Sequence, residues 1–429
     1  MLSPEQNFFK VSIWNGMPFV LVFLLALCFV EREVGLTGFW FISILSLISI
    51  YHYRYKISFS PVILFSLILF IFGCYQLCWI ELCKSSSYFS GAYSGYRSMA
   101  KILICESVLL ISFCLIDFDK KLLTCLHRFI LSAGILVISA CYVEFAFIYD
   151  FNTNHRVTLD LSRATGTSYI MVLVFILSMN SLLKLKPQNF ILHFCFFLFS
   201  FFSLLLTQTR AAILLYPIAW LALYLSSFKN SGIKLKNILF AFALIMALVV
   251  TISQPILQQR YQDFCHDVIA YTQGNSKTSV GARLAMFESG LKAGTRSSST
   301  IILGQSIEER NSYITQLVAN NPQLQGALPY LKVHLHNEFI ETFSLKGLIG
   351  IAFLLTIIFS LIKLSVVYHS YLLAVLTGTM TIFGLSDVLL FSKATVAISI
   401  CFVLAIFLEY YSHNLDKKNH NLPDSSPKF

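Results

Sequence analysis

A short motif in the last quarter of the chain places a histidine and an asparagine ahead of two glycines. His334 to Gly350 reads HLHNEFIETFSLKGLIG, which has the form H-N-x9-G-x-x-G starting at His336. A free imidazole has a pKa near ~6.5, so at neutral pH it can take a proton from an attacking hydroxyl group. His336 is therefore a candidate general base. The alternatives are that His334 and His336 are ordinary interfacial side chains or a weak metal-binding pair. Asn337 could orient the imidazole, bind a substrate, or cap the following helix.

Two arginines have the chemistry of anion binding. Arg210 lies in LLLTQTRAAILL, a hairpin so short that its guanidinium must lie at the edge of the flanking apolar segments. Arg283 lies in SVGARLAMFESG, near the start of a predicted helix whose N–H groups also favour an anion. A planar guanidinium can hold phosphate oxygens through two parallel hydrogen bonds. The alternatives are snorkelling for Arg210, and a solvated charge or an ion pair with Glu288 for Arg283.

Other polar residues give weaker signals. Asp387, in FGLSDVLLFSK, could orient His336 or an arginine, or cap a helix. Arg156 and Arg163 could form a basic rim for an anionic acceptor. We expect no metal, because the outer loops contain no Asp-x-Asp or other paired-carboxylate motif. Three acids in or beside apolar segments are expected to make helix-packing hydrogen bonds rather than a proton relay: Glu106, Glu144 and Glu409.

The composition shows what kind of protein must position these side chains. Of 429 residues, 57% are hydrophobic and only 12% are charged, and the mean hydropathy is +0.73. These values exclude a soluble globular protein, and continuous apolar runs favour membrane helices over a β-barrel. The 11 cysteines lie mostly in these runs and are interpreted as buried hydrophobic residues. The net charge of +10 is a topology signal. It does not indicate nucleic-acid binding, because clusters of Lys and Arg are absent.

Twelve apolar segments are predicted to cross the membrane. They are residues 13–30, 34–50, 61–80, 102–116, 129–148, 166–183, 190–206, 211–228, 237–252, 347–364, 368–385 and 394–411. The chain then divides into helices one to nine (1–252), one long polar loop (253–346), helices ten to twelve (347–411) and a tail (412–429).

The distribution of Lys and Arg predicts the orientation. With a cytoplasmic N-terminus, the inner segments carry fifteen of these residues and the short outer loops carry eight, which places both termini inside and the long loop outside. The loop has eight basic and seven acidic residues among many apolar ones, so we expect a folded cap. A helix is predicted over 280–292, with Leu284, Phe287 and Leu291 on one face.

The H-N-x9-G-x-x-G motif, the arginines in TQTR and GAR, and twelve segments with a long loop after the ninth together resemble the bacterial O-antigen ligases. These polytopic glycosyltransferases share a superfamily with O-antigen polymerases and some protein O-oligosaccharyltransferases. The resemblance implies an all-α integral membrane protein of the GT-C type. It also implies that the motif borders a large periplasmic loop, with the active site facing the periplasm at the inner membrane.

The resemblance further implies an inverting transfer of O-antigen polysaccharide from undecaprenyl diphosphate to a sugar hydroxyl of the lipid A-core oligosaccharide, without metal or cofactor. Arg210 and Arg283 would hold the donor diphosphate, His336 would be the base, and Asn337 and Asp387 would contact substrate. Membrane lipid and other O-antigen assembly proteins are expected partners, and nucleic acid is not. Two alternatives stay open. An O-antigen polymerase would use the same donor, and the R-x10-G spacing from Arg283 to Gly294 favours it. A lipid or polysaccharide transporter would need paired charges at mid-membrane and an internal repeat.

Overall fold

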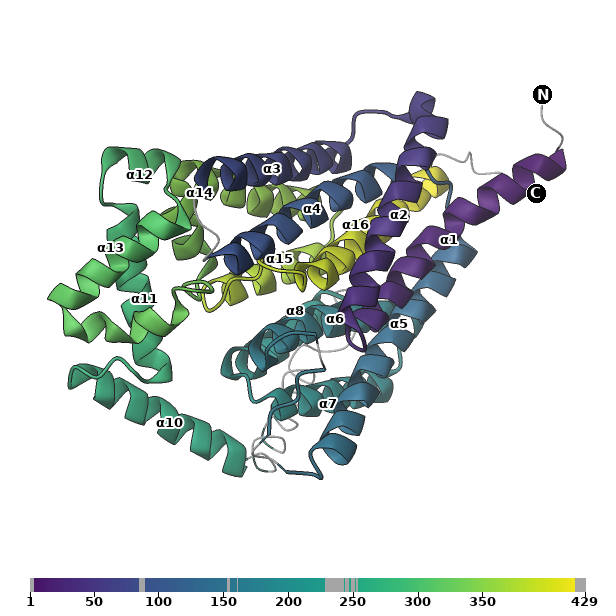
Figure 1. Ribbon diagram of the computed structural model, residues 1–429. Coiled ribbons are helices and arrows are strands. Elements are labelled where there is room, and N and C mark those ends of the chain that lie inside the picture. The colour runs from purple at the N-terminus through teal and green to yellow at the C-terminus, as the bar shows by residue number, and fades with distance from the viewer. Residues whose placement is uncertain are drawn as a thin grey trace.

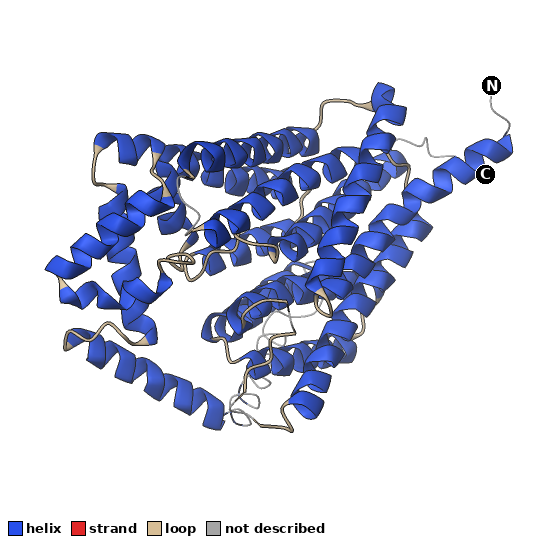
Figure 2. Cartoon of the chain, in the orientation of Figure 1, coloured by secondary structure: helices blue, strands red, loops and turns tan. Residues whose placement is uncertain are grey.

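The computed structural model describes residues 4–84, 89–152, 155–159, 161–227, 243, 247, 251 and 254–420. Within these residues the regular structure is entirely helical, as Figure 2 shows. The prediction of an all-α protein is therefore confirmed for the part of the chain that is described.

The bundle is built from helices that coincide with eleven of the twelve predicted segments. They are α1 (Pro4–Cys28), α2 (Arg32–Tyr53), α3 (Pro61–Cys83), α4 (Ser90–Phe113), α5 (Lys120–Val143, continued by a π-helical turn, Glu144–Ile148), α6 (Ala164–Leu185), α7 (Phe190–Thr207), α8 (Arg210–Ser227), α14 (Glu338–Val367), α15 (Tyr371–Gly384) and α16 (Thr395–His420). The predicted ninth segment, 237–252, lies outside the described residues except at three single positions.

Seven helices within the described residues are long and apolar enough to cross a membrane. They are Arg32–Lys56, Pro61–Cys83, Lys120–Ile148, Ala164–Leu185, Phe190–Thr207, Glu338–Val367 and Thr395–Leu415. Three shorter apolar helices accompany them: Trp14–Cys28, Arg210–Ser226 and Tyr371–Gly384. The predicted segment 102–116 belongs to neither group, because its helix α4 begins with the polar sequence SGAYSGYRSMAK.

The long loop folds into a helical cap, defined here as residues 254–330. It comprises α10 (Gln254–Thr272), α11 (Ser279–Gly294), α12 (Ser298–Leu303), α13 (Ile307–Asn320) and the 3-10 helix η3 (Pro322–Tyr330). Figure 1 shows these elements, in green, gathered at one end of the bundle, while α1 begins and α16 ends at the other. The cap therefore lies at the end of the bundle opposite the start of α1 and the end of α16.

Helix α11 confirms the helix predicted over 280–292, but its inward face differs from the apolar stripe noted in the sequence. Leu284 and Leu291 are 39% and 48% exposed, whereas the inward face consists of small residues and Met286. The reason is close packing: a Cβ atom on Gly290 would lie 2.6 Å from side-chain atoms of Leu335 and Ile340. Small residues let α11 approach the segment that carries the histidine motif.

Helix α14 begins at Glu338, nine residues before the predicted span at Gly347. The earlier start is explained by Asn337, whose side-chain Oδ1 accepts the N–H groups of Phe339 and Ile340 at 3.0 Å. Gly347 has φ +59° and breaks the helix. A Cβ atom there would lie 2.6 Å from the carbonyl oxygen of Ile302 in α12, so only glycine fits. The predicted boundary is thus the break between two helical pieces.

Candidate active site

His336 and Asp387 meet at the end of the bundle that carries the cap. His336 Nδ1 lies 2.8 Å from Asp387 Oδ1, and the same oxygen accepts the N–H of Val388 at 2.9 Å. A carboxylate can only accept a hydrogen bond, so Nδ1 carries a proton, and in the neutral tautomer with this proton Nε2 is the basic nitrogen. The backbone of His336 is left-handed, with φ +50°, and Tyr330 packs edge-on against its ring at 5.1 Å. The imidazole is therefore fixed in one orientation.

The surroundings control the charge of the two neighbouring groups. Burial lowers the pKa of His334 to about 4, and this effect outweighs the attraction of the Asp387 carboxylate. Burial alone would raise the pKa of Asp387, but the hydrogen bond from His336 and the charges of both histidines keep that pKa below its ordinary value. At neutral pH, Asp387 is ionised and His334 is uncharged.

The same three residues have the donor atoms of a metal site. One ligand atom from each of His334, His336 and Asp387 lies within 4.8 Å of the other two. In this structure, however, His334 Nδ1 accepts the backbone N–H of His336 at 3.3 Å, and Asp387 Oδ1 is engaged by His336. Both Nδ1 atoms and Asp387 Oδ1 are thus used in hydrogen bonds within this segment and its contact with Asp387.

The pair lines a cavity of about 190 Å³. Its wall is formed by the histidine segment, the loop between α15 and α16, and the start of α6, including Arg163, Thr165 and Gly166. Arg163 also acts electrostatically on His334. One of the two arginines that the sequence suggested as a basic rim therefore lies at the cavity that contains His336 and Asp387.

Arg283 approaches the same region from the cap. Its Nη1 donates to Ser279 Oγ at 3.4 Å, and its Nε is buried. The Tyr169 hydroxyl bonds to Ser386 Oγ at 2.7 Å, and the charges of Asp387, Arg283 and Arg156 all act on it. Arg283 and Asp387 therefore both act electrostatically on one hydroxyl group.

Arg210 is the first residue of α8, and its partner in this structure is an acid of the cap. Its guanidinium lies 3.9 Å from Asp263 Oδ2, with both side chains partly exposed. The preceding Thr209 Oγ1 bonds to the carbonyl of Ala164 at 3.4 Å and to Arg156 at 3.0 Å. Arg210 is thus linked to the start of α6, next to Arg163, but it is not in direct contact with His336.

Comparison with known proteins identifies the family. The O-antigen ligase domain matches residues 195–355. A curated O-antigen ligase of Escherichia coli (strain K12) is 33% identical over 345 residues, which cover 79% of each chain. The chain belongs to the O-antigen ligase family. The matched domain runs from α7 through the cap into α14 and contains Arg210, Arg283 and His336. With its apolar helices, this family member is a multi-pass membrane protein.

Two acids near the site of this O-antigen ligase family member, Glu338 and Glu341, did not stand out in the sequence. Glu338 and Glu341 lie inside the motif, and both are buried. Glu341 Oε2 lies 2.8 Å from Arg310 Nη1 and accepts the N–H of Leu335 at 2.8 Å. Their spacing of three residues, which puts them on one face of a helix, was the available signal. Apart from Leu335, their partners lie far away in the sequence.

The three acids expected to make helix-packing hydrogen bonds all have partners, but only Glu106 and Glu409 bond to another helix or its cap, whereas Glu144 bonds to a loop. Glu144 accepts the N–H groups of Thr158 and Leu159, at 3.0 and 2.8 Å, and so fixes the loop that leads to α6. Glu106 bonds to Ser399 of α16, and Glu409 bonds to Ser370. Each of these acids therefore joins separate elements of the bundle.

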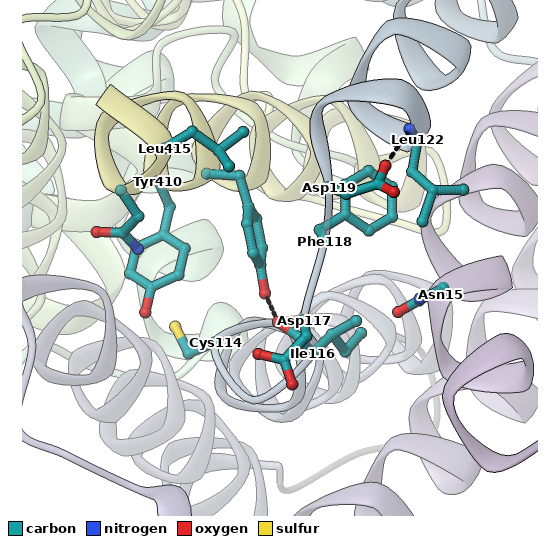
Figure 3. Close-up of a pocket in the computed structure, with 11 residues that line it drawn as sticks. Asn15, Cys114, Ile116, Asp117, Phe118, Asp119, Leu122, Tyr410 and Leu415 are labelled. Carbon is teal, nitrogen blue, oxygen red and sulfur yellow. Dashed lines mark hydrogen bonds between the residues drawn. The ribbon is translucent and has the colours of Figure 1, made fainter. Parts of the chain in front are cut away.

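A larger cavity of about 580 Å³ lies at the opposite end of the bundle in this O-antigen ligase family member (Figure 3). Tyr410 and Leu415 line it, and Tyr410 is about 22 Å along α16 from Thr395 at 1.5 Å per residue. Its acids have structural partners: Asp119 accepts the N–H of Leu122 at 2.7 Å, and Asp117 pairs with Lys56 at 3.2 Å. This cavity is separate from the His336 region.

Proposed function

We propose that the protein transfers O-antigen polysaccharide from undecaprenyl diphosphate to a sugar hydroxyl of lipid A-core oligosaccharide, at the periplasmic face of the inner membrane. Membership of the O-antigen ligase family supports a glycosyl-transfer enzyme and favours a ligase over a transporter. The observation that carries the residue roles is the 2.8 Å hydrogen bond between His336 and Asp387 beside a cavity that Arg163 also lines.

In the proposed reaction, the acceptor oxygen attacks the anomeric carbon of the donor sugar while the bond from that carbon to the diphosphate oxygen breaks. His336 Nε2 takes the acceptor proton, and Asp387 stabilises the resulting imidazolium. A single displacement of this kind inverts the anomeric configuration. The diphosphate leaves as an anion, so no acid is required to protonate it.

Arg210 and Arg283 are proposed to hold the departing diphosphate, because fixed positive charge placed where negative charge develops lowers the barrier. Both residues reach the end of the bundle where the His336 cavity lies, one from α8 and one from the cap. Arg156 and Arg163 are proposed to attract anionic groups of the acceptor. These cations take the place of a metal, and no cofactor is required.

Lipopolysaccharide profiles of a deletion strain test the reaction class. Loss of a ligase leaves polymerised chains on the lipid carrier and an unmodified core. Loss of a polymerase leaves single repeat units on the core, and that result would overturn the proposal. A purified assay of donor and acceptor, run with and without EDTA, tests metal independence, and turnover should not change.

A further inference from the structure

The carboxylate of Glu338 holds the backbone just beyond the acid of the proposed pair. Its Oε2 accepts the N–H of Leu389 at 2.7 Å and the N–H of Leu390 at 2.9 Å. Glu338 is 7% exposed, so water does not compete for these bonds. The position of the segment after Asp387 is therefore set by a side chain of α14.

Asn337 holds the same segment on its other side. Its Nδ2 donates to the carbonyl oxygen of Leu385 at 2.9 Å. Asn337 and Glu338 thus fix the backbone before and after Asp387. The preceding residue, His336, bonds to the side chain of Asp387. Three successive side chains contact one short loop at three points.

We propose that Glu338 is a positioning residue that holds Asp387 in hydrogen-bonding distance of His336 through the backbone of residues 389–390. This proposal rests on the proposed function of His336 and Asp387 and adds a role for an acid that no motif assigns. A base that loses its orienting carboxylate by a shift of about 1 Å can lose on the order of 10²-fold in rate.

Direct contact of Glu338 with substrate does not fit the geometry. Glu338 is absent from the lining of the His336 cavity and instead lines a small apolar void of about 20 Å³ between α14 and α15. The charge of Lys346 acts on Glu338 from the next turns of α14, and that ammonium lies 4.5 Å from the centre of the Tyr96 ring. The carboxylate is thus turned toward the protein.

Two substitutions of Glu338 separate the effect of its side-chain length from the effect of its charge. Glu338→Gln keeps an oxygen at the same distance from the backbone and removes the charge. Glu338→Asp keeps the charge but is one methylene too short to reach Leu389 and Leu390. In a purified assay, Glu338→Asp should lower kcat by about 10- to 100-fold while KM and donor binding stay near wild type. Glu338→Gln should recover most of that loss, and Glu288→Asp on the outer surface of α11 is the matched control.

A double-mutant cycle then locates the effect. If Glu338 acts through Asp387, adding Glu338→Asp to Asp387→Ala lowers kcat no further, whereas its effect adds to that of Arg283→Lys. Retention of activity by Glu338→Asp with loss in Glu338→Gln would overturn the positioning role, as would full additivity with Asp387→Ala. Wild-type turnover of His336→Ala and Asp387→Ala would instead refute the proposed function, whatever Glu338 does.

Discussion

Arg310 of α13 and Glu341 of α14 form an ion pair of 2.8 Å in which the side chains are 0% and 2% exposed. Glu341 also bonds to the Tyr96 hydroxyl of α4 and to the N–H of Leu335. The cap, the bundle and the segment that leads to the histidine motif are thus joined at one buried carboxylate.

Removing Arg310 should therefore destabilise the protein, because Glu341 would remain buried without its counter-charge. Arg310→Ala should cost about 3–5 kcal/mol, the usual result of breaking a buried pair. Thermal unfolding of purified protein, compared with Arg296→Ala on the exposed surface of the cap, measures the effect. Equal midpoints for both variants would show that the pair contributes little.

Replacing His336 should remove catalysis and leave donor binding. His336→Ala should insert normally and lose roughly 10²- to 10⁴-fold in turnover, the usual contribution of a positioned base. His334→Ala is the control and should be milder, because its Nδ1 bonds to the backbone of His336 and its ring packs on Phe391. The assay scores turnover beside donor binding. A variant that fails only because donor no longer binds would contradict the role of a base.

Arg210→Ala and Arg283→Ala should each remove most activity, and Lys at either position should recover only part, because a point charge replaces a bidentate fork. For Arg210, the ion pair with Asp263 offers a second explanation, in which the arginine only anchors α10. Asp263→Asn separates the two: it should keep donor binding if Arg210 serves the diphosphate, and should reproduce the loss of Arg210→Ala if the anchor is what matters.

Acid should destabilise the fold through His334. The pKa of this residue is about 4 in the folded protein and near ~6.5 in an unfolded chain, so between these values only the unfolded state takes up the proton. Stability should fall by on the order of 3 kcal/mol as the pH drops from 6.5 to 4. In His334→Gln, the thermal unfolding midpoint should change less between pH 7 and pH 5 than it does in the wild type. An equal pH dependence in both proteins would refute the lowered pKa of His334. Asp387, whose pKa is lowered, contributes only below this window.

The cap should lie outside the cytoplasm. Cys265 of α10 is partly exposed and should react with an impermeant thiol reagent in cells whose outer membrane is permeabilised. Cys265→Ser should abolish that signal. Activity of a cytoplasmic reporter fused at Gly274 would reverse the orientation.

The sequence predicts the helical bundle well because each segment carries its own signal in a continuous apolar run. His336, Arg210 and Arg283 stand out as candidates in the sequence because their local contexts are distinctive. The contact of His336 with Asp387 could only be suggested, because the two residues are 51 positions apart. Helices α14 and α15 lie between them in the chain, and no local pattern predicts how these helices pack. The partner of Arg210 was missed for the same reason: Asp263 lies in the cap, 53 residues later in the chain.

Gly347 and Gly304 also determine where a segment of the protein can be exchanged with that of a relative. A Cβ atom on Gly304 would lie 2.1 Å from the carbonyl oxygen of Leu345, so the main chains of α12 and α14 touch with no side chain between them. Two surfaces that meet this closely tolerate no mismatch. A chimera that exchanged residues 253–346 between family members would keep the contact of Gly304 with Leu345 but divide the equally close contact of Gly347 with Ile302. The exchangeable unit instead extends past Gly350 and carries the histidine motif with the cap.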